Sequence, residues 1–358
     1  MPWVETMTTT LGSGLGGFAA IAPQPTYGGA FVTPTRAVTF KTGTSTYNPH
    51  IVQGGPYLRY GALVNPGSAH VQTWLDATGT LTGDVVTVGQ AALIAWAFAT
   101  NATLQELGTT TAYALGGSAG ITLQNADANV QAGSAACLDM QYGVPTTDAV
   151  LHAENYHSCL CTKAEWVFDR AGLVSYSYDF DAQYIETTTA LITPTIVTSP
   201  VAFSMNNTAS VFKFGPYGSE VTIDGVRKAT VTIARAYDTN RIYLGQQYKE
   251  QPVTNNIIDF QLVLETDYSP SAATNIFGTW LTNTASSIII SAVGAAIGSG
   301  GFTNLFSIQL TNAFIDTGAT PTLTGPDIVK STITFKGTID ANNDPAMIAH
   351  YVCADTTF

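Results

Sequence analysis

Apolar and polar residues alternate along the segment from Phe306 to Gly337, in two stretches that a Gly/Pro-rich connection separates. Successive side chains of a strand point to opposite faces of a sheet, so a period of two indicates strands with one dry and one solvated side. We expect two half-buried strands joined by a long turn, and hence a mainly β fold. The apolar positions are Phe306, Ile308, Leu310 and Phe314, then Val329, Ile333 and Phe335.

The alternation is cleanest from Leu173 to Tyr184. The pattern predicts a dry face formed by Val174, Tyr176, Tyr178, Phe180 and Ala182, and a solvated face formed by Ser175, Ser177, Asp179, Asp181 and Gln183. Two carboxylates at i and i+2 are within reach of a glycosidase pair. Such a pair needs unlike environments that separate the two pKa values, whereas these two share one open face, so a solvated sheet face is the simpler interpretation.

Two helices are expected beside the strands. The first covers Val88 to Ala99, with Asp84 or Thr87 as its N-cap, and places Leu93, Trp96 and Ala97 on one face. The second runs from Pro270 to Leu281, with Ser269 at the cap and proline in the first turn.

We expect one large domain rather than two. Residues 1–25 contain a glycine-rich run with few apolar anchors and are expected to form an N-terminal arm, followed by a single β domain over 26–358. A strand is expected near Val71 to Leu81. Residues 101–148 are rich in Thr, Gly, Ala and Asn with weak periodicity, which indicates a loop-rich insertion, either reaching a neighbouring subunit or solvated on a single domain.

Composition narrows the classes of function. Only 11% of the residues are charged and 45% are hydrophobic, against a usual charged share of about 25%. Such a surface is typical of stacked assemblies and of secreted lectins and adhesins. The net charge of −12, with 13 basic and 25 acidic residues, argues against tight binding of nucleic acid, which needs a basic stripe. Residues 1–10 do not read as a signal peptide, so a soluble protein made in the cytoplasm is expected.

Candidate chemistry is sparse. His157, Cys159 and Cys161 should share one face of a strand and could begin a zinc site, but a fourth ligand is missing, so small half-buried cysteines are the simpler interpretation. A Cys-His nucleophile would need an activating geometry that sequence does not reveal. Cys137 and Cys353 could pair, but nothing in the sequence requires it. We therefore expect no catalytic, cofactor or metal site, and no enzyme.

Four segments resemble bacteriophage tail tube proteins in their order along the chain. An asparagine near a strand end, a Pro-x-Leu-x-Gly turn and an Ile-x-Phe-x-Gly strand, all within 306–337, resemble the closing hairpin of that family. Thr26 to Arg36 resembles its opening, Tyr156 to Tyr184 its central hairpin, and Thr222 to Gly245 the hairpin that follows. The resemblance covers about two thirds of the chain.

The resemblance implies a tail-tube-type β-sandwich or barrel with one or two flanking helices and a long loop. Six copies would close a ring through joined sheets, and stacked rings would make the conduit for the genome in the virion tail, assembled in the cytoplasm of the host bacterium. The implied partners are further copies of the chain, the tape-measure, terminator and distal tail or baseplate proteins, and passing DNA, with no membrane and no cofactor. The lumen would be lined by Ser175, Ser177, Asp179, Asp181 and Gln183.

Two other classes stay open. A carbohydrate-binding or adhesin β-sandwich would need exposed aromatic platforms, for which Tyr217, Tyr243 and Tyr248 are candidates. A capsid or decoration protein would share the same composition.

Overall fold

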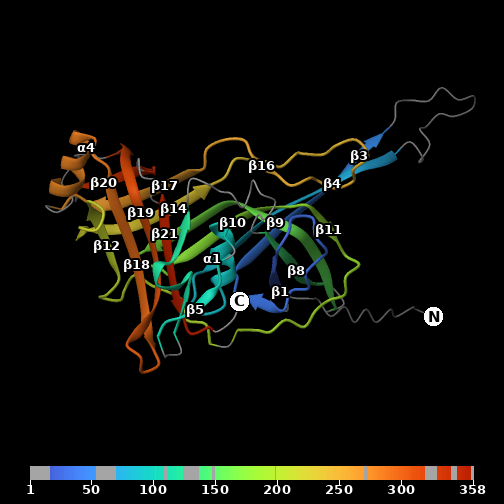
Figure 1. Ribbon diagram of the computed structural model, residues 1–358, viewed down its shortest axis with the longest axis horizontal. Coiled ribbons are helices and arrows are strands. Elements are labelled where there is room, and N and C mark those ends of the chain that lie inside the picture. Colours follow the sequence, from blue (N-terminus) through green and yellow to red (C-terminus); the bar gives the residue numbers. More distant parts are fainter. Residues whose placement is uncertain are drawn as a thin grey trace, which may run out of the picture.

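The computed structural model describes residues 17–53, 70–100, 102–108, 112–123, 137–146, 150–197, 199–269, 273–318, 329–339 and 345–355. The protein is mainly β, with an elongated body from which the hairpin of β3 and β4 projects at one end (Figure 1). The strands are β1 (Phe18–Gln24), β2 (Arg36–Val38), β3 (Thr42–Gln53), β4 (His70–Asp84), β5 (Leu104–Glu106), β6 (Tyr113–Leu115), β7 (Ile121–Leu123), β8 (Cys137–Pro145), β9 (Leu151–Asp169), β10 (Ser175–Ala182), β11 (Tyr184–Glu186), β12 (Val211–Gly215), β13 (Val221–Thr222), β14 (Val226–Ala234), β15 (Tyr237–Asp238), β16 (Val253–Thr254), β17 (Asp259–Asp267), β18 (Ser286–Ile297), β19 (Phe302–Thr317), β20 (Lys330–Gly337) and β21 (Met347–Cys353).

Two long strands, β9 and β19, join the three parts of the large sheet. All the strand pairs named below are antiparallel. The first part, called the main sheet here, has the order β3-β4-β10-β9-β14-β17-β20-β19. The second continues from β19 to β18, β12 and β13 on one side and to β21, β6 and β7 on the other. The third, β2-β1-β8-β9-β11, uses the first half of β9.

The second part folds back over the main sheet and buries a common core. Phe306 of β19 contacts the rings of Trp166 and Phe168 of β9, at centroid distances of 6.3 and 5.7 Å. Phe214 of β12 meets Phe335 of β20 at 5.8 Å. These contacts describe an open β-sandwich, and the described strands do not close into the barrel that was the other expected form.

Cross-strand rows explain why the inner face of the main sheet is dry. Tyr176, Trp166, Val231, Leu262 and Phe335 follow one another across five neighbouring strands, and all are buried. The predicted dry face of β10 is confirmed at each of its five positions, from Val174 to Ala182. Alternation within each strand, combined with this register, directs apolar side chains to one side of the sheet.

The helix α1 (Ala91–Ala97) lies in the core, and all seven of its residues are buried. Trp96 donates its indole Nε1–H to the carbonyl oxygen of Cys159 at 2.9 Å and contacts the rings of Tyr178 and Phe180. The sequence predicted one apolar face for this helix, but the whole helix is buried. A seven-residue helix between a sheet and its covering segments has no solvated side.

The predicted start of this helix was wrong. Gly89 has a φ of +87°, a left-handed conformation that a right-handed helix excludes, so the helix begins only after Gln90. The Gln90 side chain accepts a hydrogen bond from Val86 N and donates one to Asp84 O, at 3.0 and 2.8 Å. Asp84 instead pairs with Lys41 at 2.6 Å, and neither expected cap is used.

A second helical segment follows β17, as expected, but it is shorter. A π-helical turn, η4 (Ala273–Phe277), leads into α4 (Gly278–Thr282), and Asn283 ends the helix in the left-handed conformation. Its predicted first turn at Pro270 lies outside the described residues.

The two strands of the C-terminal hairpin are confirmed as β19 and β20, with one change of phase. Phe306, Ile308 and Leu310 are buried, but Phe314 is only half-buried and Ala313 takes the inner position. The register against β18 slips between the pairs Leu310–Ile288 and Ala313–Ser286. One extra residue in β19 inverts the alternation beyond it.

Two expected irregular regions contain ordered strands. Within the expected arm, β1 pairs with both β2 and β8, and its Ala19 and Ala20 are fully buried. The described part of 101–148 holds β5, β6, the 3₁₀ turn η3 (Gly117–Ala119), β7 and β8. Strands of three residues are too short to show a periodicity, and alanine packs tightly without marking a core position in sequence. Residues 1–16 of the expected arm lie outside the described residues.

No helix among the described residues is long and apolar enough to cross a bilayer.

Replacing Phe306 with alanine should lower the free energy of unfolding by about 3–5 kcal/mol, because it empties the ring contact between the two packed sheets. Urea unfolding followed by tryptophan fluorescence measures this loss. Tyr217→Ala is the control: Tyr217 is 59% exposed, and its loss should change stability by less than about 0.5 kcal/mol. Equal losses in the two variants would contradict the proposed role of Phe306 in the core.

Candidate functional site

The outer surface of the main sheet is a broad polar face. Register places Ser177 of β10 opposite both Thr82 of β4 and Glu165 of β9, and the row continues through Thr232 to Gln261 and Lys336. Neighbouring rows add hydroxyl and charged groups in the same way. We call this surface the polar face; its main members are Thr80, Thr82, Ser175, Ser177, Asp179, Lys163, Glu165, Thr230, Thr232, Gln261, Glu265, Thr332, Thr334 and Lys336.

Charges of both signs are interspersed on the polar face. Lys163 Nζ lies 3.1 Å from Glu165 Oε2, and Lys228 Nζ lies 4.0 Å from Glu265 Oε1. Exposed pairs of this kind contribute little to stability, but they cancel local charge. The described residues of this face therefore form a surface of mixed charge.

Three of the five predicted lining residues lie on the open part of this face. Ser175, Ser177 and Asp179 are half-buried between β4 and β9. Thr80 donates its hydroxyl to Asp179 Oδ1 at 2.7 Å, which holds the carboxylate along the sheet.

The other two predicted residues contact a distant segment of the chain, and one of them, Asp181, is buried. Asp181 is only 4% exposed, and its Oδ1 lies 2.6 Å from Nζ of Lys249. Gln183 donates its amide to the carbonyl oxygen of Lys249 at 2.9 Å. The prediction that Asp181 shares an open face with Asp179 was wrong, because a distant segment of chain lies over the end of β10.

That segment is the tip of an extended hairpin. The chain leaves β14, forms the short pair β15 and β16, and between them makes an excursion over residues 239–252, which we call the strap. Figure 1 shows this chain running along the body toward the projecting hairpin. Leu75 N donates to Gln247 O at 3.4 Å, and the ring of Tyr248 stacks on Tyr184 at 4.2 Å.

The predicted cluster of His157, Cys159 and Cys161 does not form. Between Tyr156 and Cys159 of β9, two residues oppose one residue of β8, and Ser158 has a φ of +49°. The bulge turns His157 to the opposite face, where its ring lies between Phe31 and Tyr184, at 4.6 and 4.0 Å. Across the described residues, no three His, Cys, Asp or Glu side chains come together as metal ligands.

The four cysteines are free and buried, so Cys137 and Cys353 do not pair. Burial raises the pKa of Cys137, Cys161 and Cys353 to about 12, and that of Cys159 well above its usual value. A nucleophilic cysteine needs the opposite shift. These thiols pack as small apolar groups.

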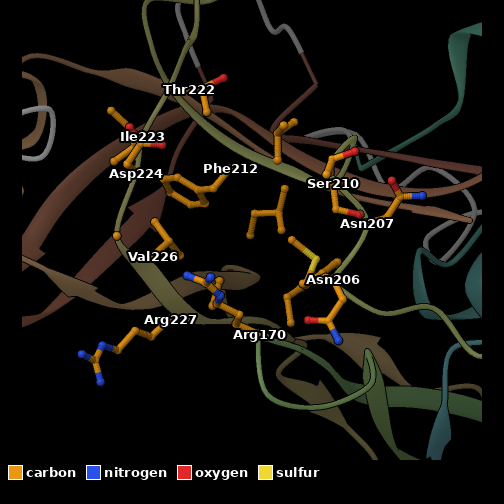
Figure 2. A pocket seen from close by; sticks show the side chains of 17 residues that line it. Arg170, Asn206, Asn207, Ser210, Phe212, Thr222, Ile223, Asp224, Val226 and Arg227 are labelled. Carbon is orange, nitrogen blue, oxygen red and sulfur yellow. The ribbon is translucent and has the colours of Figure 1, made fainter.

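A cavity of about 390 Å³ opens where the two packed sheets separate, near the start of β14 (Figure 2). Its lining includes the buried apolar residues Phe168, Phe212 and Ile290 and the charged residues Arg170, Arg227 and Asp224. Arg227 is already held by Asp267 through two hydrogen bonds of 2.8 and 3.1 Å. With one carboxylate and no histidine or cysteine among its lining residues, the cavity offers no acid-base pair.

The sequence did not reveal the residue that separates the open part of the candidate site from the buried part. Lys249 is 1% exposed and contacts Asp181 from 68 positions along the chain, and it also contacts Asp76. Its sequence context, Gln-Gln-Tyr-Lys-Glu-Gln, reads as a solvated loop. Nothing local marks this lysine as buried.

No protein-family model matches the chain, and no curated protein matches it significantly.

Replacing Asp181 with lysine should lower the free energy of unfolding by about 3–5 kcal/mol, because it places a second cation beside a buried ammonium group. Asp179→Lys is the matched control on the same strand and should cost about 1 kcal/mol or less. Chemical denaturation of both variants measures the difference. Similar small losses would mean that Asp181 is solvated.

Proposed function

We propose that this protein is a structural subunit of a bacteriophage tail tube, in which copies close into rings that stack around the passing genome. The observation that carries the proposal is the main sheet itself: a wide antiparallel sheet whose polar face ends at an open edge strand, β3. The sequence resemblance to tail tube proteins supports the same assignment.

The edge strand favours pairing with another copy. Among the described strands β3 pairs only with β4, so one row of its backbone donors and acceptors faces away from the sheet. Protein edges of this length are usually blocked by charge, and β3 carries no Asp, Glu, Lys or Arg, with Pro49 as its one blocking residue. Adding the sheet of a second copy there satisfies the edge, and six such joints close a ring.

The polar face suits the wall of a conduit. Its hydroxyls and paired charges offer no run of free cations to neutralise phosphates, so duplex DNA would meet a surface that does not hold it. Six copies would carry a net charge of −72, six times −12. In this role Ser175, Ser177 and Asp179 line the lumen, whereas Asp181 and Gln183 bind the strap at Lys249.

This function implies a location and a set of partner proteins. The subunit would assemble in the cytoplasm of the host bacterium and remain in the virion tail. It would meet tape-measure, terminator and distal tail or baseplate proteins at the ends of the tube.

A carbohydrate-binding or adhesin protein is the second candidate, and exposed tyrosines favour it. Tyr217 and Tyr243 are 59% and 55% exposed. They belong to different segments, the turn after β12 and the strap. A capsid or decoration protein fits the same composition, and the experiment below separates these classes.

Purified protein at micromolar concentration should form rings or tubes in negative-stain images, alone or with a tail initiator complex, and chelators should not dissolve them. Thr44→Lys/Thr46→Lys places charge on the edge strand and should raise the concentration needed for assembly at least about tenfold, a cost of about 1.4 kcal/mol per contact. The control is Thr332→Lys, on the polar face and away from that edge.

Sedimentation across the same concentrations shows whether the protein stays monomeric, which is the contrary result. A monomer that never polymerises, and that binds immobilised glycans, would support the carbohydrate-binding candidate instead.

A further inference from the structure

The strap is anchored by one buried lysine. Lys249 Nζ lies 2.6 Å from Asp181 Oδ1 and 2.6 Å from Asp76 Oδ1, with only 1% of its side chain exposed. A lysine is almost never fully buried unless it is paired. Both pairs are charge-assisted hydrogen bonds, the one to Asp181 buried and the one to Asp76 partly buried, since the Asp76 side chain is 24% exposed.

The rest of the strap is held lightly. Of residues 239–252 only Lys249 and Pro252 are buried. Tyr243 is 55% exposed and Leu244 is fully exposed. Glu250 N donates to Arg241 O at 2.8 Å, so the strap closes its own turn and contacts the body mainly around the lysine.

The lysine sits where three elements meet. Asp76 belongs to β4 and directly precedes Ala77, which is the first residue of that strand to pair with β10. From this point β3 and β4 continue as the projecting hairpin (Figure 1). We call its residues 48–53 and 70–76 the arm; it is distinct from the N-terminal arm that the sequence predicted. The ion pairs therefore join the strap to the end of β10 and to the base of the arm.

We propose that Lys249 is a clasp that locks the strap onto the base of the arm, so that strap and arm present one surface to a second copy of the chain. The clasp is a regulatory element of the assembly and in that respect rests on the proposed function. When it opens, the strap with Tyr243 and Leu244 is released from the arm.

The charged and titratable groups around the clasp come from every neighbouring element. Asp76 and Asp181 face the ammonium group directly, and His50 of β3 approaches Asp76 at 4.0 Å. Asp181 acts electrostatically on Tyr27, as does Glu250 of the strap. Asp139, Cys137 and Cys159 lie buried in the same region, and Tyr184 and Tyr248 of the strap stack beside it.

The clasp has a defined dependence on pH. Burial raises the pKa of Asp181 to about 6, against the opposing attraction of Lys249, and Asp76 raises it further. Once the strap opens, Asp181 is solvated and should titrate near its ordinary value of about 3.9. The closed state thus binds more protons between these two values, so lowering the pH from 8 to 5 favours closing.

Hydrogen exchange of the full chain, read by mass spectrometry and corrected for intrinsic rates, tests the clasp. In Lys249→Met, peptides of residues 239–252 should exchange at least tenfold faster, while those of β10 stay protected. Lys41→Met is the matched control: it removes an exposed pair with Asp84 and should leave the strap unchanged. The wild-type strap should be better protected at pH 5 than at pH 8, and Asp181→Asn should flatten that dependence.

A second variant keeps the test decisive if Lys249→Met unfolds. Asp76→Asn/Asp181→Asn/Lys249→Met leaves no unpaired buried charge and should fold with an open strap. Trypsin cleavage after Arg241, within the strap, should then be faster than in the wild type. A strap as protected as the wild type in this triple variant would overturn the clasp.

Sedimentation of the same proteins separates the clasp from the proposed function. If the wild type stays monomeric while Lys249→Met or the triple variant opens the strap, the clasp stands and the tube assignment fails. If the wild type assembles and the triple variant assembles equally well with an open strap, the regulatory part of the proposal is wrong.

Discussion

The contact between Phe306 and the aromatic rings of β9 is the constraint on which the rest of this structure depends. A sheet of this width has two faces, and only one of them can be solvated. By covering one face with β19, β18 and β12, the chain commits the opposite face to polar residues and leaves α1 no solvated side. The polar face is the consequence of this packing, since the register that directs Trp166 inward directs Glu165 outward.

The periodicity of the sequence correctly predicted the features that depend on residues close together in the chain. The dry face of β10, the strands β19 and β20 and the presence of two helical segments were correct, because each depends on neighbours within a few positions. The failures have a different origin. Ala313 replaces Phe314 in the core because one added residue in β19 shifts the phase, and no sequence rule marks where a bulge occurs.

Long-range contacts explain the remaining errors. The identity of β1 as a strand rests on pairing with β8, and Gln24 bonds to Asp139 across 115 positions. Asp181 was assigned to an open face because alternation gives the side on which a residue lies, but not what later covers that side. The candidate site was therefore predictable for Ser175, Ser177 and Asp179 and unpredictable for Asp181 and Gln183, whose environment is set by Lys249.

The long strand β9 has a mechanical consequence. Its 19 residues belong to two parts of the sheet at once: the first half pairs with β8 and β11, and the second half with β10 and β14. A force applied along β9 loads its flanking hydrogen bonds in shear, so that they resist together and would not open one by one like a zipper. The protein can thereby carry tension between its ends through a single continuous piece of backbone.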